Sequence, residues 1–146
     1  MSLFSSISVS ASGMSAQRER AEVLVENIAN ADTTRTAEGG PYRRRDVVFQ
    51  SQGAESPFSS VFQNQFAGAA NNGVAVSDIV VDNSEPDRRY MPGHPDADKD
   101  GYVAFPRINP AEDMVDLMGA SRAYQANVSA ISAVKEMIQR SIDLFR

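Results

Sequence analysis

The feature that most constrains this sequence is a pair of long segments, one near each end, in which apolar residues recur at helical spacing. The first segment runs from Leu3 to about Ala29, and the second begins at Asn109. Steps of three, four or seven residues place side chains on one face of a helix. The first face comprises Leu3, Ile7, Ala11, Met14, Ala21, Leu24 and Ile28, and the second comprises Met114, Leu117, Tyr124, Val128, Ile131, Ile138, Ile142 and Phe145. We therefore predict two long amphipathic helices.

The second segment carries a strong signal for the start of a helix. Asn109 can act as an N-cap, Pro110 is tolerated at the first helical position, and Glu112 lies three residues after the cap. A helix of roughly 35 residues at 1.5 Å per residue would be about 50 Å long, longer than a globule that this chain could form. Gly13 is a weak point of the first helix, because glycine costs about 1 kcal/mol there relative to alanine.

The length of the two helices favours a polymer subunit over a self-contained globule. Two helices joined only by a small insert cannot bury all of their apolar stripes within one chain. We therefore predict that part of each stripe packs against neighbouring copies. We also predict that the terminal segments are largely disordered in the isolated monomer and become helical on assembly, because ordering each residue costs about 1 to 2 kcal/mol of backbone entropy.

The segment between the helices has a different composition. Residues 32–108 contain all of the prolines except Pro110. Runs of β-branched and aromatic residues predict three strands. These runs are Val47–Phe49, Val74–Val81 and Tyr102–Phe105. The stretch from Gln50 to Asn72 is compatible with a loop, a short helix or a segment that orders only on assembly.

These patterns predict an α+β fold. The N- and C-terminal helices would pair as a coiled-coil-like hairpin, with a small β-rich and loop-rich insert between them. The predicted boundaries are residues 1–31 for the N-terminal polymerisation helix, 32–108 for the insert and 109–146 for the C-terminal polymerisation helix.

Composition excludes several classes of function. A net charge of -5 argues against sequence-independent binding of nucleic acid, which requires a basic surface. The absence of cysteine excludes disulfides and thiolate metal sites. The first residues lack the positive and continuous apolar regions of a secretory signal, and no stretch approaches the roughly 18 apolar residues of a membrane span. We expect no membrane insertion and, if the chain is exported, no cleaved signal peptide.

The run Asp96-Ala97-Asp98-Lys99-Asp100-Gly101 resembles the opening of a calcium-binding loop, with three carboxylates at alternate positions and a glycine for the sharp turn. However, the twelfth loop position falls on Arg107, and nearby prolines exclude flanking helices. We therefore predict a solvated turn that leads into the strand at Tyr102. A calcium-binding interaction module that uses this loop is the alternative function.

The sequence offers no convincing catalytic constellation. His94 is the only histidine and has no second histidine or cysteine to complete a metal or catalytic set. The acidic residues Glu112, Asp113 and Asp116 are predicted to lie on an exposed face of the first helical turns, where the helix dipole favours negative charge. We predict that the protein is not an enzyme, with no catalytic residues, no cofactor and no bound metal.

The run Arg43-Arg44-Arg45 is the main basic cluster. Three positive charges in an acidic chain fall short of a nucleic-acid-binding surface. The favoured interpretation is a strand whose arginines form ion pairs between subunits. A specific anion site is the second interpretation.

Several motifs together resemble a known family. The segment from Ser12 to Arg18, followed by Asn27-Ile28-Ala29-Asn30-Ala31-Asp32-Thr33, resembles the signature of the axial proteins of the bacterial flagellum, the rod and hook proteins. The runs Gly39–Arg44, Asp100–Val103 and Ile108–Met118, continued by Ser121–Asn127, are similar to the proximal rod members of this family. Asn30 suits the end of a helix, because asparagine can bond the turn that follows.

This resemblance implies a structural subunit of the flagellar basal-body rod, the drive shaft that crosses the periplasm and transmits torque. It implies export through the flagellar export apparatus and assembly with copies of itself, with the rod proteins FlgB, FlgF and FlgG, and with the adaptor FliE. It also implies that the paired helices line the rod and that the insert faces outward. The predicted subunit-interface residues are Leu3, Ile7, Met14, Leu24, Ile28, Asn30, Tyr124, Asn127, Ile131, Ile138, Ile142 and Phe145.

Overall fold

The computed structural model describes residues 3–52 and 73–144. Within them, two long helices flank four strands. The helices are α1 (Leu3–Ala29) and α3 (Pro110–Asp143), and the strands are β1 (Arg45–Gln52), β2 (Gly73–Val81), β3 (Asp87–Tyr90) and β4 (Tyr102–Phe105). The predicted α+β fold, with paired terminal helices and a small antiparallel insert, is therefore confirmed.

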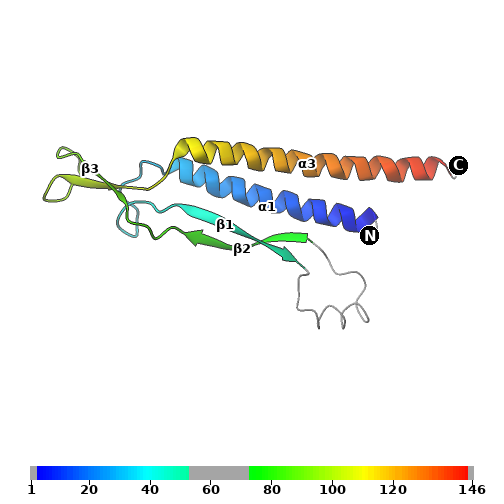
Figure 1. Cartoon of the computed structure of the whole chain (residues 1–146), viewed down its shortest axis with the longest axis horizontal. Coiled ribbons are helices and arrows are strands. Elements are labelled where there is room, and N and C mark those ends of the chain that lie inside the picture. Colours follow the sequence, from blue (N-terminus) through cyan, green and yellow to red (C-terminus); the bar gives the residue numbers. More distant parts are fainter. Residues whose placement is uncertain (1–2, 53–72, 145–146) are drawn as a thin grey trace, which may run out of the picture.

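The elements form three layers, with α1 in the middle. Figure 1 shows α3 running antiparallel along one side of α1, while the β1–β2 hairpin lies along the other side. The β3–β4 hairpin projects beyond the end at which α1 finishes and α3 begins, whereas α1 begins and α3 ends toward the opposite end. We call the end next to the β3–β4 hairpin proximal and the end at which α1 begins and α3 ends distal.

The start of α3 is capped as predicted, but only in part. The Asn109 Oδ1 accepts a hydrogen bond from the backbone N–H of Ala111 at 3.2 Å, and Pro110 occupies the first helical position. The backbone N–H of Asp113 donates to the carbonyl of Asn109 at 3.1 Å. Among the hydrogen bonds of the described residues, Glu112 makes none back to Asn109. The asparagine therefore caps the helix without the reciprocal glutamate bond that the spacing predicted.

The line of α3 that faces α1 consists of residues seven positions apart. Asp113 and Ala120 are both 1% exposed, and Val134 is 8% exposed. Between them, Asn127 lies over Gly13 of α1, where an added Cβ would stand 3.1 Å from the Asn127 Nδ2. The predicted weak point at Gly13 is therefore a place where the two helices approach each other closely, and the missing side chain of glycine makes room for the asparagine.

The predicted apolar stripe of α3 does not coincide with this buried line. Met114, Tyr124, Val128 and Ile142 are between 41% and 62% exposed. At 3.6 residues per turn, the stripe is centred roughly 60° to one side of the line that faces α1. On α1 the buried apolar residues are Ala16, Val23 and Leu24, of which only Leu24 belongs to the predicted stripe. The helices therefore pack through smaller residues than the periodicity indicates.

The β1–β2 hairpin pairs antiparallel from Arg45 with Val81 to Gln52 with Gly73, and its register shifts between Val48 and Phe49. The three predicted strands are confirmed within β1, β2 and β4. For the stretch from Gln50 to Asn72 we predicted a loop, a short helix or a segment that orders only on assembly. Its first three residues are instead the end of β1, and residues 53–72 lie outside the described residues.

Strand β3 was not predicted, because Asp87-Arg88-Arg89-Tyr90 lacks β-branched residues. It forms because it pairs with β4, from Asp87 with Phe105 to Tyr90 with Tyr102. The β4 side chains Val103 and Phe105 are 0% and 8% exposed. The Arg89 guanidinium lies 4.7 Å from the centre of the Phe105 ring and covers it. The second hairpin is therefore stabilised by the buried side of β4 and by Arg89 of β3, which covers Phe105.

Candidate functional site

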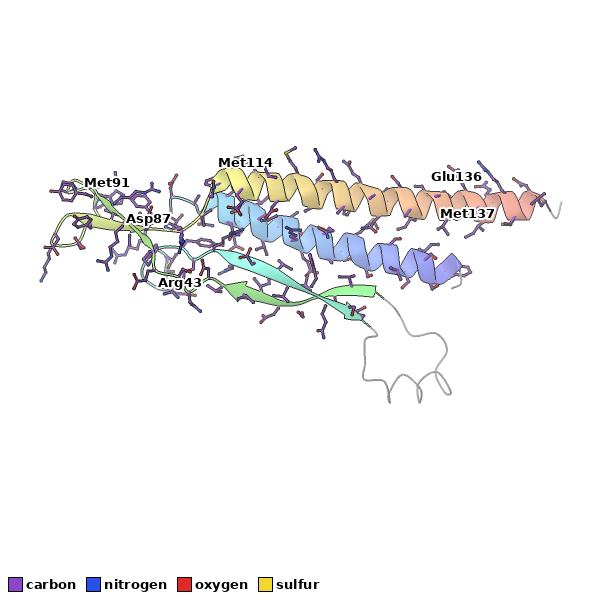
Figure 2. All side chains as sticks on the ribbon, in the orientation of Figure 1. Arg43, Asp87, Met91, Met114, Glu136 and Met137 are labelled. Atoms are coloured by element: carbon purple, nitrogen blue, oxygen red, sulfur yellow. The ribbon has the colours of Figure 1, made fainter. Side chains whose placement is uncertain are left out.

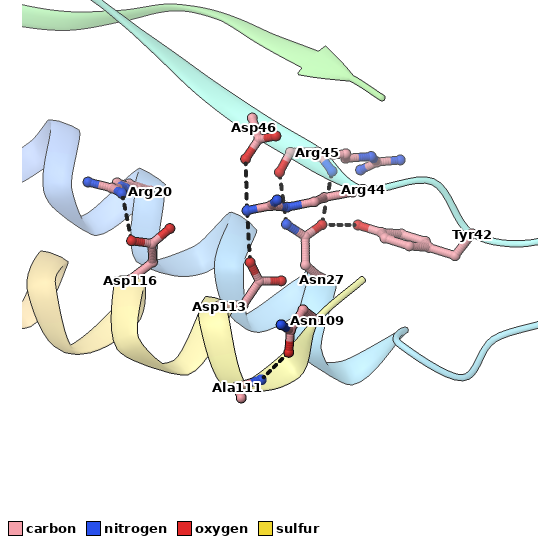
Figure 3. A network of polar contacts seen from close by, with 10 residues as sticks. All are labelled: Arg20, Asn27, Tyr42, Arg44, Arg45, Asp46, Asn109, Ala111, Asp113 and Asp116. Atoms are coloured by element: carbon pink, nitrogen blue, oxygen red, sulfur yellow. Dashed lines mark hydrogen bonds and ion pairs between the residues drawn. The ribbon is translucent and has the colours of Figure 1, made fainter. Parts of the chain in front are cut away.

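A network of buried polar side chains joins the helices to the insert at the proximal end (Figure 3). Its centre is Asn27, which is 0% exposed. The Asn27 Nδ2 donates to the carbonyl of Arg45 at 2.8 Å, and its Oδ1 accepts from the Arg45 backbone N–H at 3.0 Å. The Tyr42 hydroxyl donates to the same Oδ1 at 3.1 Å. The asparagine thus pairs with the first residue of β1 as a neighbouring strand would.

The next residue of the network is Arg44, which joins α3 to the insert. Its Nη2 lies 2.9 Å from the Oδ1 of Asp113 and 3.5 Å from the Oδ1 of Asp46. The Oδ2 of Asp113 and the Nε of Arg44 are both buried without a hydrogen-bond partner in the structure. Burial raises the pKa of Asp113, and the charge of Arg44 lowers it in part. We call Arg44 and Asp113 the junction pair.

The structure corrects one prediction about these charges. Asp113 was expected on an exposed face of α3, but it is 1% exposed on the line that faces α1, and its carboxylate pairs with Arg44 of the insert. The helix dipole at the first turn of α3 accounted for a negative charge at Asp113, but it did not indicate that Arg44 is the partner of this charge. The members of the arginine run bond within the single chain, and their predicted ion pairs between subunits stay a prediction. Arg43 donates to Asn83 at 2.7 Å, and Arg45 pairs with Glu26 at 2.9 Å.

Tyr42 completes the network. Its side chain is 7% exposed, and burial is the main cause that raises the pKa of its hydroxyl. The Arg45 guanidinium stands 5.7 Å from the centre of its ring. Because the hydroxyl stays protonated at neutral pH, it remains a donor to Asn27. The tyrosine therefore supports the asparagine that connects α1 to β1.

Asn30 ends α1, as the motif indicates. Its Nδ2 donates to the carbonyl of Glu26 at 2.9 Å, and its Oδ1 accepts from the Thr33 hydroxyl at 3.1 Å. The Glu26 carbonyl also accepts from the Asn30 backbone N–H at 3.1 Å, so the side chain adds a second bond to the last turn of the helix. Asn27 and Asn30 thus have different roles in the same motif, since the first binds a strand and the second terminates a helix.

The calcium-like run forms a compact turn. The Asp98 Oδ1 accepts from the backbone N–H groups of Asp100 and Tyr102 at 3.0 and 2.8 Å, and Gly101 has a φ of +82°. Asp96 accepts from the Thr34 hydroxyl at 2.8 Å. The carboxylates therefore stabilise the local backbone and the adjacent loop. No group of three or more metal-binding side chains occurs among residues 3–52 and 73–144, and nothing favours the calcium-binding alternative.

His94 lies in the same region. Its Nδ1 accepts from the Asp96 backbone N–H at 3.1 Å, and its ring centre stands 6.4 Å from that of Phe105. Thr34 and Ser84 each donate a hydroxyl hydrogen bond to a carboxylate, Thr34 to Asp96 at 2.8 Å and Ser84 to Asp82 at 2.6 Å. The hydrogen bonds from Ser84 lower the pKa of Asp82, which makes this carboxylate a weaker base. We interpret the Asp82–Ser84 segment as a turn that stabilises the chain directly after β2.

The predicted interface residues occupy different environments. Leu24 is buried inside the chain, and Tyr124 and Ile142 are 41% and 62% exposed. The side chain of Leu3 and the whole of Phe145 lie outside the described residues. The remaining members are half-buried: Ile7, Met14, Ile28, Asn30, Asn127, Ile131 and Ile138.

The helix pair exposes many large apolar side chains. Figure 2 labels two of them, Met114 and Met137, which are 53% and 49% exposed. Together the exposed residues of the helices are Phe4, Val9, Val25, Met114, Val115, Met118, Tyr124, Val128, Met137 and Ile142. Large exposed apolar surfaces mark sites of protein interaction. Neither of the described helices has the length and apolar content that a membrane-spanning segment requires.

Sequence reasoning missed the residues that hold the junction together. Asn27 and Tyr42 were noted only as parts of motifs, and Asp113 was assigned to solvent. A spacing signal was present, because Asp113, Ala120, Asn127 and Val134 recur every seven residues. Small and polar residues at such a spacing can mark the line along which two helices approach closely, but hydrophobic periodicity gives them little weight.

Comparisons with known proteins agree with these motifs. Residues 7–35 match the family model described as "Flagella basal body rod protein", and residues 99–144 match the model "Flagellar basal body rod FlgEFG protein C-terminal". The flagellar basal-body rod protein FlgC of Bacillus subtilis is 43% identical over 99% of this chain and 99% of its own length.

Two further relatives show the same relation over the whole chain. The FlgC protein of Borreliella burgdorferi is 40% identical over 100% of this chain and 99% of its own length. That of Salmonella typhimurium is 35% identical over 99% of this chain and 98% of its own length. Similarity of this extent at both ends and through the insert shows that the chain belongs to the FlgC family of flagellar basal-body rod proteins.

Proposed function

We propose that this protein is a structural subunit that assembles into the flagellar basal-body rod through its terminal helices. The observation that carries this proposal is the apolar surface along α3. Only Asp113, Ala120 and Val134 of this helix are buried, while Met114, Tyr124, Val128 and Ile142 remain exposed. Burying one such side chain contributes about 1.5 to 3 kcal/mol. Packing against a neighbouring copy would supply that burial.

The subunit interface is assigned mainly to the exposed flank of α3. Tyr124 and Ile142 lie on it, together with Met114 and Val128, which the same stripe contains. The half-buried members of the predicted set on α3 are Asn127, Ile131 and Ile138, whereas Ile7, Met14 and Ile28 belong to α1. Leu24 belongs to the core of the single chain, so we do not expect it to contact a neighbour.

The proposed mechanism is mechanical. Side-by-side packing of helices would transmit torque from one subunit to the next, with no bond made or broken. We propose residues 1–31 and 109–146 as the polymerising units, and residues 32–108 as the insert that faces outward. The junction network at Asn27 and Arg44 would transfer load between the insert and the helix pair.

The proposed partners are copies of this chain, the rod proteins FlgB, FlgF and FlgG, and the adaptor FliE. The proposed location is the rod of the basal body, in the periplasmic space. We propose export through the flagellar export apparatus without a cleaved signal peptide. These proposals rest on the family and on the exposed helical surface.

The proposal can be tested in a Bacillus subtilis strain that lacks its own FlgC protein. The chain should restore motility and assemble into rods that electron microscopy can detect. The double substitution Tyr124→Ser with Val128→Ser should abolish assembly and motility, while circular dichroism of the purified monomer stays unchanged. The matched control is Val80→Ser, which changes a side chain on β2 that is 49% exposed. Normal assembly of the double variant, or equal failure of the control, would contradict the assignment of the interface to α3.

A further inference from the structure

The rotation of α3 about its own axis leaves large apolar side chains of its stripe exposed, among them Tyr124 and Val128 at 41% and 42%. The stripe that contains Tyr124 and Val128 is centred roughly 60° away from the line that faces α1. A roll of α3 in that direction would bring these side chains onto α1. In the structure the line that faces α1 instead consists of Asp113, Ala120 and Asn127, followed by Val134. A contact that fixes α3 against its surroundings would oppose the roll.

The junction pair is placed to provide that contact. The bond from Arg44 to Asp113 is the one hydrogen bond or ion pair, among the described residues, that joins α3 to the insert. The next residue, Arg45, is held to α1 by both backbone hydrogen bonds to Asn27. Asp113 is thereby fixed with respect to α1 through two residues of the insert (Figure 3).

The junction pair is poorly arranged to stabilise the fold. Asp113 is 1% exposed, yet only one of its carboxylate oxygens has a partner. The Arg44 Nε is also buried without a partner, and the Nη2 is shared between Asp113 and Asp46. A buried ion pair with incomplete hydrogen bonding does not recover the cost of removing its charges from water. The raised pKa of Asp113 agrees with this, because desolvation is its largest cause.

We propose that Arg44 and Asp113 are positioning residues that set the roll of α3 and keep its apolar stripe exposed, without stabilising the folded chain. The pair acts as a directional contact, whereas apolar packing between α1 and α3 would tolerate several rolls. This role concerns the single chain and does not depend on the proposed interface. If the stripe is the subunit interface, the junction pair makes it available to neighbours.

Protonation provides a readout that separates positioning from stability. The pKa of Asp113 is raised above its ordinary value of 3.8. The stabilisation that Asp113 contributes to the folded chain is therefore fully present when the pH is below its ordinary pKa. That stabilisation is lost as the pH rises through the raised pKa of Asp113 in the folded chain. Acidification should raise the contribution of Asp113 to the stability of the folded chain. At the same time it removes the negative charge of Asp113 that holds Arg44. The charged and titratable groups around Asp113 are Arg44, Asp46 and Tyr42 of the insert, Glu112 and Asp116 of α3, and Arg20 of α1, which pairs with Asp116.

The test uses the absence of tryptophan from the chain. Tyr124→Trp places a single fluorophore on the stripe, the stripe probe, and Arg122→Trp places one on the exposed side of α3, the control probe. In each background the junction pair is replaced by Arg44→Met with Asp113→Leu. We expect a urea midpoint equal to or higher than that of the parent. The emission of the stripe probe should shift to shorter wavelength and become less sensitive to acrylamide quenching as the stripe rolls onto α1, while the control probe should not change.

The matched control is the neighbouring ion pair of Arg20 and Asp116, which joins α1 to α3 at 3.4 Å and is about one-third to two-fifths exposed. Arg20→Met with Asp116→Leu should leave the stripe probe exposed. A lower urea midpoint in the junction variant would show that the pair stabilises the fold, and unchanged quenching of the stripe probe would show that it does not position α3. Either result overturns the proposal.

The parent protein, carrying either probe, supplies a second measurement if the junction variant fails to fold. Lowering the pH should reduce the quenching of the stripe probe while far-UV circular dichroism is retained, because protonated Asp113 no longer holds Arg44 by charge. The same pH change should leave the control probe unaltered. Quenching of the stripe probe that stays constant as Asp113 titrates would overturn the proposal.

Discussion

The proximal and distal halves of the helix pair differ in what holds them together. In the proximal half, Ala16, Val23, Leu24 and Asn27 of α1 are buried, and α3 buries Asp113 and Ala120 against them. In the distal half, among the residues whose side chains are described, only Val134 is buried. All of the charged residues of α1 also lie in its proximal half, since residues 3–17 contain none.

This difference indicates which part of the chain folds by itself. The proximal half has a core, a cap at Asn109 and the polar network around Asn27. The distal half has exposed apolar side chains such as Phe4, which is 78% exposed, and a tertiary hydrogen bond from the Val74 N–H to the Ser12 hydroxyl at 3.1 Å. Each ordered residue costs about 1 to 2 kcal/mol of backbone entropy. The distal turns recover little of that cost within one chain.

The largest expected contrast is in amide hydrogen exchange of the dilute monomer. The prediction that the terminal helices order only on assembly becomes more specific with the structure. We expect protection for residues 16–29 and 110–120, and exchange close to that of an unfolded chain for residues 5–12 and 130–142, since local opening there approaches zero free energy. Mass spectrometry of peptides from both halves measures this directly.

Assembly provides the matched condition for that experiment. The distal residues should become protected in assembled rods, while the proximal residues change little. Strong protection of both halves in the monomer would mean that the helix pair is a self-sufficient unit. In that case the contrast in burial would not correspond to a contrast in stability.

The second-largest effect is expected when Asn27, the centre of the polar network, is replaced. Asn27→Ala removes three hydrogen bonds and leaves the backbone of Arg45 and the hydroxyl of Tyr42 without these partners. We expect a loss of about 3 kcal/mol in the free energy of unfolding, because buried polar groups without partners cost about 1 to 3 kcal/mol each. Urea denaturation followed by circular dichroism measures it.

Asn83→Ala is the control for this substitution. Asn83 is exposed and accepts one hydrogen bond from Arg43. Surface changes of this kind stay within about 0.5 kcal/mol. Similar losses for both variants would show that the junction is no more important than a surface contact.

The sequence predicted the elements better than their packing. Helical spacing located both helices, and the Asn109-Pro110 pair located the start of α3, because these signals are local. The roll of α3 is a tertiary property. It depends on Arg44, which lies 69 positions from Asp113 along the chain, and no pattern within either segment indicates that they meet. Pairing with β4 likewise created β3 from a charged segment.

The candidate interface was predictable only as a set of apolar positions. Periodicity grouped Leu24 with Ile7 and Ile28, but it could not show that Leu24 is enclosed by its own chain. Conversely, Met118 and Val115 fall outside the periodic stripe and are 55% and 67% exposed. The small residues Gly13 and Ala120 let the two helices approach each other closely. This packing decides which apolar residues remain exposed and available to a neighbouring subunit.

A smaller effect is expected at the start of α3. Asn109→Ala removes the bond to the Ala111 N–H at 3.2 Å and should cost about 1 kcal/mol of stability. Glu112→Gln should have less effect, because the described residues show no bond from Glu112 to the cap. Thermal unfolding of both variants separates the two. Equal losses would mean that the glutamate completes the cap in solution.

The smallest effect tests whether the distal packing is as loose as its burial indicates. Gly13→Ala should gain up to about 1 kcal/mol from helix propensity. The new Cβ would stand 3.1 Å from the Asn127 Nδ2, so that side chain must move by a few tenths of an ångström. Asn127 also donates to the Ala123 carbonyl at 3.0 Å, which restrains it in part. Because its surroundings are thinly packed, we expect the amide to move and a net stabilisation of a few tenths of 1 kcal/mol to remain. Thermal unfolding of Gly13→Ala, alone and combined with Asn127→Ala, measures the coupling. A destabilised single variant that Asn127→Ala rescues would show that the helices fit tightly at this point, and the distal half would then resemble the proximal half more closely than its exposure indicates.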